Sequence, residues 1–380
     1  MKTLNRFDSY RAEFPITENF TFLNHAAVSP ISLRVEKTMA SLFEEFSHCG
    51  LACYEKWAKR IDEVRELFAT LIHGSSDEIA FLGNTSEGLS AIASGIKWKA
   101  GDGVMVPRQD FPANIYPWMN LIKRDVRVHF YERREGRFGV ESIKKSLRPG
   151  TRLLSVSSVD FATGFLCDLE ALGDFCRRNE LLFCVDAIQS LGIIPMDVKK
   201  YGVHFLASGA HKWLLSPMGC GGLFISKDIN HIVHPEKVGW KSVIDDENFF
   251  KIHFELKPNA LRFETGTMNV AGIHALGSAL ELLMEVGVEE IFRRVLLLND
   301  HLYRSLGDLN LKVVSPWGWG ERSGILSFIP NSAPDALFRH LKAHQISVSL
   351  RGNMIRLSPH FYNNAEDINR FLEVLDSYSR

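Results

Sequence analysis

The stretch LLFCVDAIQSLGIIPMDVKKYGVHFLASGAHK, residues 181–212, indicates the fold of this chain. It contains two short, continuously apolar runs, residues 181–185 and 203–208, and each run is followed by polar residues. Such runs are typical of parallel strands that are covered on both faces. Because ligands of open α/β sheets bind at the carboxyl ends of the strands, the polar residues after each run are candidates for a functional site.

The same alternation of apolar runs and helical patterns extends on both sides of this stretch. Further strands are predicted at residues 78–82, 103–107, 152–158 and 222–226. Helices are predicted at residues 84–96, from Pro112 onward, and at residues 169–179. Short buried strands that alternate with helices predict an α/β fold with a mostly parallel sheet between helices.

The pattern changes after about residue 255. One long helical pattern covers residues 271–306, and it is followed by strand candidates at 311–314 and 324–329, a helix at 333–344, strands near 346–350 and 354–357, and a final helix at 365–378. This order is typical of an α+β unit. We therefore predict an N-terminal segment (1–20), a large domain (21–255) and a smaller C-terminal domain (256–380).

Composition narrows the class of protein. The chain has 380 residues, 46% of them hydrophobic, and a formal net charge of −1, which argues against a nucleic-acid-binding surface. Basic pairs such as Arg133-Arg134 are short and lie near acids, so they are interpreted as solvated surface. His231 and His234 have no further ligand pattern around them, and no metal is expected.

The location follows from the termini and the cysteines. The polar N-terminus lacks the apolar core of a signal peptide, and no apolar stretch reaches the ~18 residues of a membrane span. The six cysteines are scattered and several lie in apolar runs, which indicates buried free thiols in a reducing compartment. A cytoplasmic enzyme that acts on a small molecule is therefore expected.

Lys212 is the residue with the sharpest chemical signal. Between residues 203 and 225 the only basic residues are His204, His211 and Lys212, and no acid occurs. Most lysines are solvated, but burial in such apolar surroundings lowers the pKa of a lysine and provides the neutral amine that forms a Schiff base. Asp186 ends a buried strand and needs either a cationic partner, such as a pyridinium N–H, or neighbouring backbone N–H groups.

The segment from Gly83 to Gly88, GNTSEG, opens a predicted helix. Small residues and hydroxyls at a helix start bind phosphate through backbone N–H groups and the positive end of the helix dipole. The alternative is an ordinary N-cap with a capping glutamate, and the segment alone favours that alternative.

The order of the motifs points to a family. The segments occur as LNHAAVSP (23–30), NTSEG (84–88), DFPANIYPW (110–118), DAIQ (186–189), HKWLL (211–215) and RLSPHFYN (356–363). Together, from about residue 20 to 378, they resemble the class V aminotransferase family of fold type I pyridoxal-phosphate enzymes, and most of all its isopenicillin-N-epimerase-like and cysteine-desulfurase-like branch. The resemblance implies a large domain with a seven-stranded, mostly parallel sheet, and a smaller α+β domain.

The resemblance also implies a cofactor, pyridoxal 5′-phosphate, and roles for individual residues. Lys212 would hold the cofactor as an imine and move the α-proton, and Asp186 would keep the ring nitrogen protonated. Gln189 would bind the phenolic oxygen, and Phe111 would stack on the ring unless it is a core residue. The remaining cofactor contacts would be Thr85, Ser86, Ser208, His211, Trp240 and Thr267.

Thr267 would reach the phosphate from a partner subunit, which predicts a homodimer with a shared site. Asn24, His25 and Arg356 would line the substrate side, with Arg356 clamping a carboxylate. The alternative for Arg356 is a surface salt bridge, which its apolar neighbours make less favoured.

Two features depart from the family pattern. Asp160 stands where relatives often carry an amide, and a second carboxylate beside Asp186 would be repelled, so no direct ring contact is expected from Asp160 unless a proton is shared. In addition, no cysteine occurs after Cys220, whereas cysteine desulfurases need a mobile cysteine near the arginine. A persulfide mechanism is therefore not expected.

The reaction type stays open at this point. Aminotransfer, epimerisation and β-elimination, including C–S lysis without a persulfide, share their first steps on an amino acid or related amine, and aminotransfer is the most general expectation. A protein that binds the cofactor without catalysis is a further alternative. A nucleotide-dependent oxidoreductase is disfavoured because residues 83–88 lack the Gly-x-Gly-x-x-Gly pattern.

Overall fold

The structure is a computed structural model that describes residues 4–134 and 136–379. Its centre is a seven-stranded sheet in the order β2-β8-β7-β6-β5-β3-β4. The strands are β2 (Ile79–Leu82), β3 (Gly103–Pro107), β4 (Arg127–Tyr131), β5 (Thr151–Ser157), β6 (Leu182–Asp186), β7 (Phe205–Gly209) and β8 (Gly221–Ile225). Only β8 pairs antiparallel with its neighbours β2 and β7, so the predicted mostly parallel sheet is confirmed.

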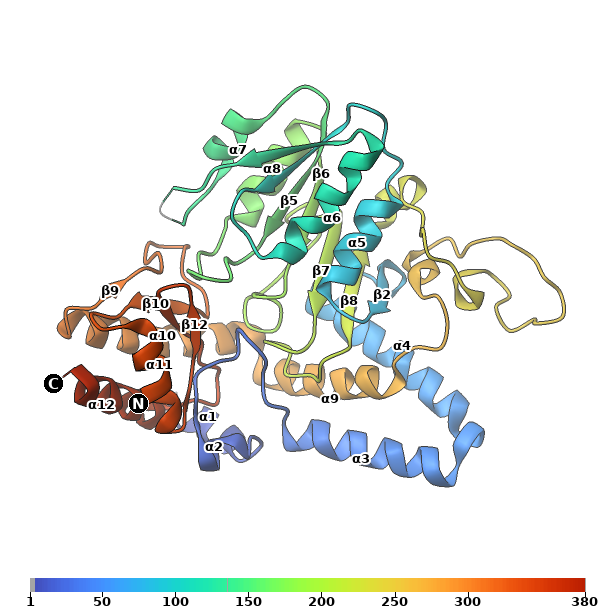
Figure 1. Ribbon diagram of the computed structural model, residues 1–380. Coiled ribbons are helices and arrows are strands. Elements are labelled where there is room, and N and C mark those ends of the chain that lie inside the picture. Colours follow the sequence, from blue (N-terminus) through green and yellow to red (C-terminus); the bar gives the residue numbers. More distant parts are fainter. Residues whose placement is uncertain (1–3, 135, 380) are drawn as a thin grey trace.

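Both faces of this sheet are covered, which explains why its central strands are apolar without alternation. Within β6, Phe183 and Val185 belong to one core cluster, and Cys184 belongs to the cluster on the other face. Figure 1 shows α5 (Thr85–Gly95) and α6 (Tyr116–Met119) in front of the sheet. The other large helices around it are α3 (Leu33–His48), α4 (Tyr54–Leu71), α7 (Val140–Ser146), α8 (Leu169–Arg178) and α9 (Val270–Val286).

Two local predictions need correction. The strand β4 was not predicted, because it lies at the edge of the sheet and is only partly buried, so it lacks the continuous apolar run of its neighbours. The predicted helix from Pro112 is a succession of short pieces, namely η3 (Pro112–Asn114), α6 and η4 (Asn120–Arg124).

The long helical pattern at residues 271–306 is two helices, α9 and α10 (Val288–Asp308), rather than one. The break is at Gly287, whose φ of +89° lies outside the α-helical region. The two helices are bent by 76° at this glycine. In the described part of the chain no single helix has the length and apolar character of a membrane span, and only this bent pair meets those criteria when its two helices are taken together.

The C-terminal part forms a four-stranded sheet in the order β12-β13-β10-β9. Its elements are β9 (Lys312–Val313), β10 (Leu326–Ile329), α11 (Pro334–Ala343), β12 (Ser349–Arg351), β13 (Met354–Leu357) and α12 (Ala365–Ser379). The chain start, with α1 (Leu4–Arg11) and α2 (Ile16–Asn19), lies beside this unit (Figure 1). The strand β1 (Thr21–Phe22) pairs in parallel with β11 (Ile346–Ser347).

The predicted domain limits, at residues 20 and 255, remain predictions. The helix α9 follows the second limit, yet it packs on α3 and α4 within the main core cluster. The C-terminal core cluster begins in α10 and includes Leu23 from the start of the chain. We therefore propose that the division between the two units falls near Gly287.

The close approach of α4 to the sheet depends on Gly222 in β8. A methyl group at Gly222 would lie 2.2 Å from Cζ of Phe68. We expect Gly222→Ala to lower the free energy of unfolding by about 1–3 kcal/mol through overpacking, and Phe68→Leu to recover part of that loss. Gly307→Ala is the control, because Gly307 lies in α10 with no neighbouring atom within 4 Å, and alanine there gains up to about 1 kcal/mol of helix propensity. Urea unfolding of the variants measures both changes, and equal effects at the two glycines would contradict the packing argument.

Candidate active site

Polar residues gather where the parallel strands end. Asp110 follows β3, Ser157 ends β5, Asp186 ends β6, and Lys212 follows β7 by three residues. The register pairs Ser157 with Asp186 and Asp186 with Ala207, so these strand ends lie side by side. This is the edge at which an open α/β sheet binds its ligands.

Lys212 is a buried amine at this edge. Its side chain is 9% exposed, and burial lowers its pKa to about 8, although the charge of Asp186 acts in the opposite direction. The positive charges of Arg356 and Arg351 lower the pKa further. A lysine with this pKa is partly neutral at physiological pH and can attack a carbonyl group.

Asp186 is the acid next to it. Its carboxyl group accepts a hydrogen bond from the backbone N–H of Ile188, at 3.1 Å. That contact does not compensate for burial, which raises the pKa of Asp186 to about 7, helped by the charge of Asp110 and opposed by Lys212. A buried acid in this state gains most from a cationic partner, and the pyridinium N–H of pyridoxal phosphate is such a partner.

Gln189 has a fixed orientation. Its Nε2 donates to the backbone oxygen of Ala26, at 3.1 Å, and its Oε1 accepts from Nε1 of Trp213, at 3.0 Å. An indole N–H can only donate and a carbonyl oxygen can only accept, so these two contacts define which end of the amide carries the N–H groups. Gln189 therefore retains one N–H for a further acceptor, as the predicted contact with the phenolic oxygen requires. Trp213, which follows Lys212 directly, was not singled out in the sequence.

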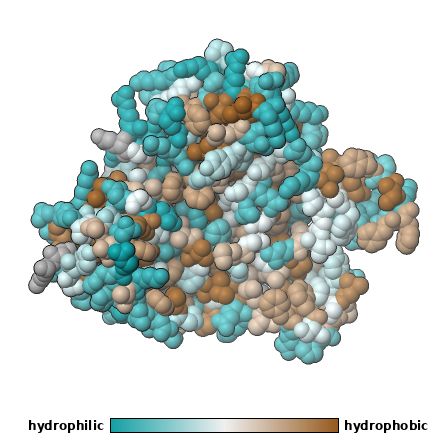
Figure 2. All heavy atoms as spheres, viewed as in Figure 1, coloured by the Kyte–Doolittle hydropathy of each residue, from teal (hydrophilic) through white to brown (hydrophobic). Residues whose placement is uncertain are grey.

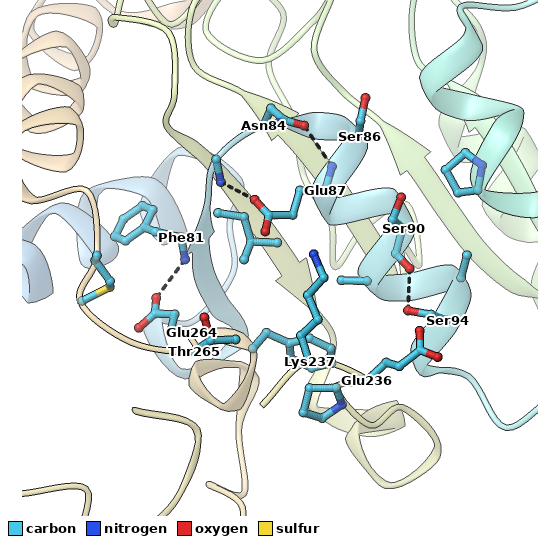
Figure 3. A pocket seen from close by; sticks show the side chains of 18 of the residues that line it. Phe81, Asn84, Ser86, Glu87, Ser90, Ser94, Glu236, Lys237, Glu264 and Thr265 are labelled. Carbon is cyan, nitrogen blue, oxygen red and sulfur yellow. Dashed lines mark hydrogen bonds between the residues drawn. The ribbon is translucent and has the colours of Figure 1, made fainter. Parts of the chain in front are cut away.

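The start of α5 is both a capped helix end and a candidate phosphate site. Asn84 accepts from the backbone N–H of Glu87, and the Glu87 carboxylate accepts from the backbone N–H of Gly83 (Figure 3). The predicted N-cap is thus formed. A cap satisfies only part of a helix start, and the other N–H groups of its first turn can bind an anion.

The predicted phosphate contacts surround this helix start. Thr85 is buried and its hydroxyl accepts from the backbone N–H of Gly209, at 2.8 Å, whereas Ser86 is exposed. Ser208 is buried and donates to the Gly209 oxygen. Burial lowers the pKa of His211, and the charge of Lys212 lowers it further, so His211 is favoured as a neutral donor.

A cavity of about 560 Å³ opens beside the start of α5. Ser86 lines it on one side, and the segment from Glu264 to Thr267 lines it on the other (Figure 3). Thr267 is exposed in this cavity, which Lys212 and Asp186 do not line. Trp240, in η6 (Trp240–Ser242), is 41% exposed and packs edge-on against Phe249.

Phe111 lies on the open side of the lysine. Its ring is 45% exposed, so the alternative of a core phenylalanine is wrong. The Nζ atom of Lys212 lies 5.7 Å from the centre of the ring. The Phe111 ring is therefore available to cover a flat group bound at Lys212.

Asp160 does not stand beside Asp186 as an unpaired charge. Arg133 donates through Nη1 to Asp160, and its Nη2 lies 3.6 Å from Oδ2 of the buried Asp110. The side chain of Arg133 is 7% exposed, so its interpretation as solvated surface was wrong. Asp110 also binds the side chains of Asn114 and Ser157. One arginine thus holds two buried carboxylates, a pairing for which the sequence carries no local signal.

Arg356, which was predicted to bind the substrate, is a buried cation. It lies on β13, is 1% exposed, and donates through Nη1 to the Phe161 oxygen, at 2.5 Å, and through Nη2 to the Ser349 hydroxyl, at 3.4 Å. Burial lowers its pKa to about 9. Among the described residues no carboxylate forms an ion pair with it, so the alternative of a surface salt bridge is wrong. Asn24 supports this arginine by accepting from the Ser349 hydroxyl, at 2.6 Å.

His25 lies beneath the site, not on its surface. It is 0% exposed, and its Nδ1–H donates to the Ser358 oxygen while its Nε2 accepts from the Tyr362 hydroxyl. Burial lowers its pKa to about 3, so the ring is neutral. This placement favours a positioning role for His25 over the predicted contact with substrate.

The six cysteines are free thiols. Four are buried as predicted, but Cys49 is exposed and Cys53 is half-buried, because both lie at the turn between α3 and α4. Within the described ranges, no group of three or more histidine, cysteine or acidic side chains could hold a metal ion.

A buried amine that is partly neutral, next to a buried acid at the strand ends of a mostly parallel sheet, defines the site of a fold type I pyridoxal-phosphate enzyme. Comparison with known proteins gives the family. The family model described as "Aminotransferase class-V" matches residues 21–371, so the chain belongs to the class V aminotransferase family, which depends on pyridoxal phosphate.

Individual relatives are moderately similar over their whole length. The chain is 29% identical to a probable cysteine desulfurase of Methanothermobacter thermautotrophicus, over 98% of each chain, and 27% identical to the uncharacterized aminotransferase YcbU of Bacillus subtilis, over 97% of each. Among solved structures it resembles the apo cysteine desulfurase of Thermococcus onnurineus NA1, with a TM-score of 0.90 and 25% identity over 97% of each chain. The cystine C–S lyase C-DES, at 23% identity, has the same fold with a TM-score of 0.89 over 95% of this chain and 98% of that chain.

The lowered pKa of Lys212 predicts how the apoprotein takes up pyridoxal phosphate. Only the neutral amine reacts, so the rate of cofactor uptake should rise with pH, with a midpoint at about 8, and level off above it, whereas an ordinary lysine would give a midpoint at about 10.4. Asp186 raises the pKa of Lys212, so Asp186→Asn should move the midpoint below that of the wild type. Stopped-flow absorbance measures both midpoints.

Asp174→Asn serves as the control, because Asp174 is a half-exposed acid on α8 whose charge is not among those that act on Lys212. Its midpoint should equal that of the wild type. A wild-type midpoint near 10 would show that Lys212 is solvated and not the reactive amine.

Proposed function

We propose that this enzyme acts on an α-amino acid. Arg356 would bind its carboxylate, and its amine would react with the cofactor that Lys212 holds. The observation that carries this proposal is a buried guanidinium without an acidic partner in the described part of the chain, close enough to Lys212 for its charge to act on that amine. A buried cation is costly unless it is paired, and a substrate carboxylate would supply the pair.

Each residue of the site has a task in this proposal. When bound, pyridoxal phosphate supplies an electron sink that allows a bond at the α-carbon to break. Asp186 keeps a proton on the ring nitrogen, and Gln189 donates to the phenolic oxygen. Lys212, once its Nζ is free, takes the α-proton and returns it.

The C-terminal part and the chain start would orient the substrate. Ser349 bridges Asn24 and the Nη2 of Arg356, which fixes the plane of the guanidinium. The ring of Phe111, whose centre lies 5.7 Å from Nζ of Lys212, would cover one face of a flat group bound there. The start of α5, with Thr85 and Ser86 in its first turn, would hold the phosphate of the cofactor.

Two reactions that share these first steps are candidates for the activity of this enzyme. Aminotransfer is the general activity of the family and is our first candidate. C–S bond cleavage is the second, favoured by relatives named cysteine desulfurase and by a structural neighbour named cystine C–S lyase. A protein-bound persulfide has no place in either, because no cysteine follows Cys220. In addition, β12 and β13 are joined by a turn of only two residues.

The deciding experiment combines a spectrum with a product assay. The purified protein should show a visible band of bound cofactor that is absent in Lys212→Ala. A panel of amino acids should shift this band, and Arg356→Gln should weaken that response by about 10- to 100-fold, since it removes hydrogen bonds to a charged group. Simple amines without a carboxylate are the matched ligands and should respond equally in both proteins.

Products then separate the candidates. Aminotransfer consumes an added keto acid and forms a new amino acid, whereas C–S cleavage releases sulfide or sulfane sulfur without a keto acid. A wild type that stays colourless after incubation with pyridoxal phosphate would contradict the whole proposal.

We also propose a homodimer with a shared active site in a cytoplasmic setting. Support for the dimer comes from residues 243–259, which connect η6 to η7 (Ala260–Phe263). This segment projects from the body on the right of Figure 1. Apolar residues gather on this projection (Figure 2), and Phe250 is 100% exposed. Exposed apolar surface of this kind is typical of a protein interface. The free thiols fit a reducing compartment.

If the projecting segment forms the dimer interface, a charge introduced into it should separate the two subunits. Phe250→Asp should shift the protein from dimer to monomer in analytical ultracentrifugation and weaken cofactor retention. Trp319→Asp is the control, because Trp319 is similarly exposed on a loop of the small unit, and it should leave the dimer intact. A wild-type protein that is monomeric and retains the cofactor fully would contradict the shared site.

Mixed dimers test whether Thr267 acts across the interface. A dimer of one Lys212→Ala subunit and one Thr267→Ala subunit has one complete site only if Thr267 serves the partner's lysine. We expect this mixed dimer to hold one cofactor with wild-type affinity. Reduced affinity at its single remaining lysine would show that Thr267 serves its own subunit.

A further inference from the structure

A second arginine, Arg351, lies on the same hairpin as Arg356. The strands β12 and β13 are joined by the two-residue turn Gly352-Asn353, with Gly352 at φ +59°, which the first central position of a type II′ turn requires. This turn pairs Arg351 with Met354 and Ser349 with Arg356. A hairpin of this length leaves no freedom in the register.

The register places both arginines on one face. Residues directly opposite each other in an antiparallel pair point to the same side, and so do residues two apart on one strand. Arg351 therefore shares a face with Ser349 and Arg356. As diagonal neighbours, the two arginines are separated by about 7–8 Å at their backbones.

This face is the one turned toward the reactive lysine. Ser349 and Arg356 bind each other on it, and Arg356 donates to the backbone oxygen of Phe161, whose ring packs edge-on against Phe111. The positive charges of both arginines act on Lys212, and the charge of Arg351 acts on Arg356 as well. The face thus contributes two positive charges to one site.

In the described part of the chain no carboxylate forms an ion pair with either arginine, although the charge of Asp160 acts on Arg356. Arg351 is half-buried, its side chain donates to the backbone oxygen of Leu350, and no carboxylate of the described ranges pairs with it. The nearby acids Asp110 and Asp160 both form ion pairs with Arg133. A single substrate carboxylate at Arg356 would leave Arg351 without an anion.

We propose that Arg351 binds a second acidic group of the substrate, so that the preferred substrate is an α-amino acid with a further carboxylate or sulfinate. This inference rests on the proposed function and specifies its substrate class. The second group would lie within one side-chain length of the α-carboxylate, as in aspartate or cysteine sulfinate, or at the far end of a disulfide, as in cystine. Both arginines offer planar donor pairs that match such oxyanions.

Binding of simple acids tests the proposal without turnover. The perturbation of the visible cofactor band would be titrated with succinate, which has two carboxylates, and with propionate, which has one. We expect Arg351→Gln to weaken succinate binding by about 10- to 100-fold, as for the loss of a hydrogen bond to a charged group, and to leave propionate binding within about twofold. Arg351→Lys should recover part of the succinate affinity.

Turnover identifies which acidic amino acid is preferred. The value of kcat/KM would be measured for alanine and cysteine, with one acidic group, and for aspartate, cysteine sulfinate and cystine, with two. We expect the second set to be favoured in the wild type and to lose that preference in Arg351→Gln. Arg178→Gln, a change of an exposed arginine on α8, is the control and should behave as the wild type.

Two results would overturn the inference. Equal losses for succinate and propionate in Arg351→Gln would mean that Arg351 serves only the shared carboxylate, and no loss for either would mean that it faces solvent. In both cases a visible band that depends on Lys212 would leave the proposed function intact. Absence of that band in the wild type would instead defeat the proposed function, and this inference with it.

Discussion

The burial of Lys212 beside Asp186 is the interaction on which the rest of the site depends. Burial favours the neutral form of each group, so the lysine is held near pKa 8 and the acid near pKa 7. Each therefore has a proton that moves at little cost near neutral pH. The sheet creates this condition, because parallel strands covered on both faces bring their ends to a dry edge. A bound pyridinium N–H would supply the cationic partner that the buried Asp186 lacks.

The chain start joins the two units across this edge. Ala26 accepts from Gln189 of the large sheet, and Ser29 N–H donates to the oxygen of His211, next to the reactive lysine. On the other side, His25 binds Ser358 and Tyr362 of the C-terminal part. The segment from Asn24 to Ser29 thus fixes Lys212, Gln189 and Arg356 relative to one another. Its buried polar groups are satisfied, which makes it a rigid connector and not a flexible lid.

The hairpin of β12 and β13 carries the two arginines whose charges act on Lys212. A two-residue turn holds Arg351 and Arg356 in fixed register and carries no cysteine. In the proposed function, recognition of the substrate would depend on the positions of these two cations. The aminotransfer and C–S cleavage candidates both remain compatible with such a site, because each begins with the same bound carboxylate and the same neutral amine.

The sequence by itself predicted the fold class and singled out Lys212, Asp186 and Arg356, because apolar runs and their polar ends are local patterns. The roles predicted for these residues came from the resemblance of their motifs to a family. The sequence did not determine β4, whose edge position makes it polar, or the break at Gly287, where the apolar pattern continues across a glycine. It also missed the pairing of Arg133 with Asp110 and Asp160, the role of Trp213 and the shared face of the two arginines. Only the tertiary structure decided these features, because each depends on residues distant in sequence whose approach is set by sheet register and packing rather than by their neighbours along the chain.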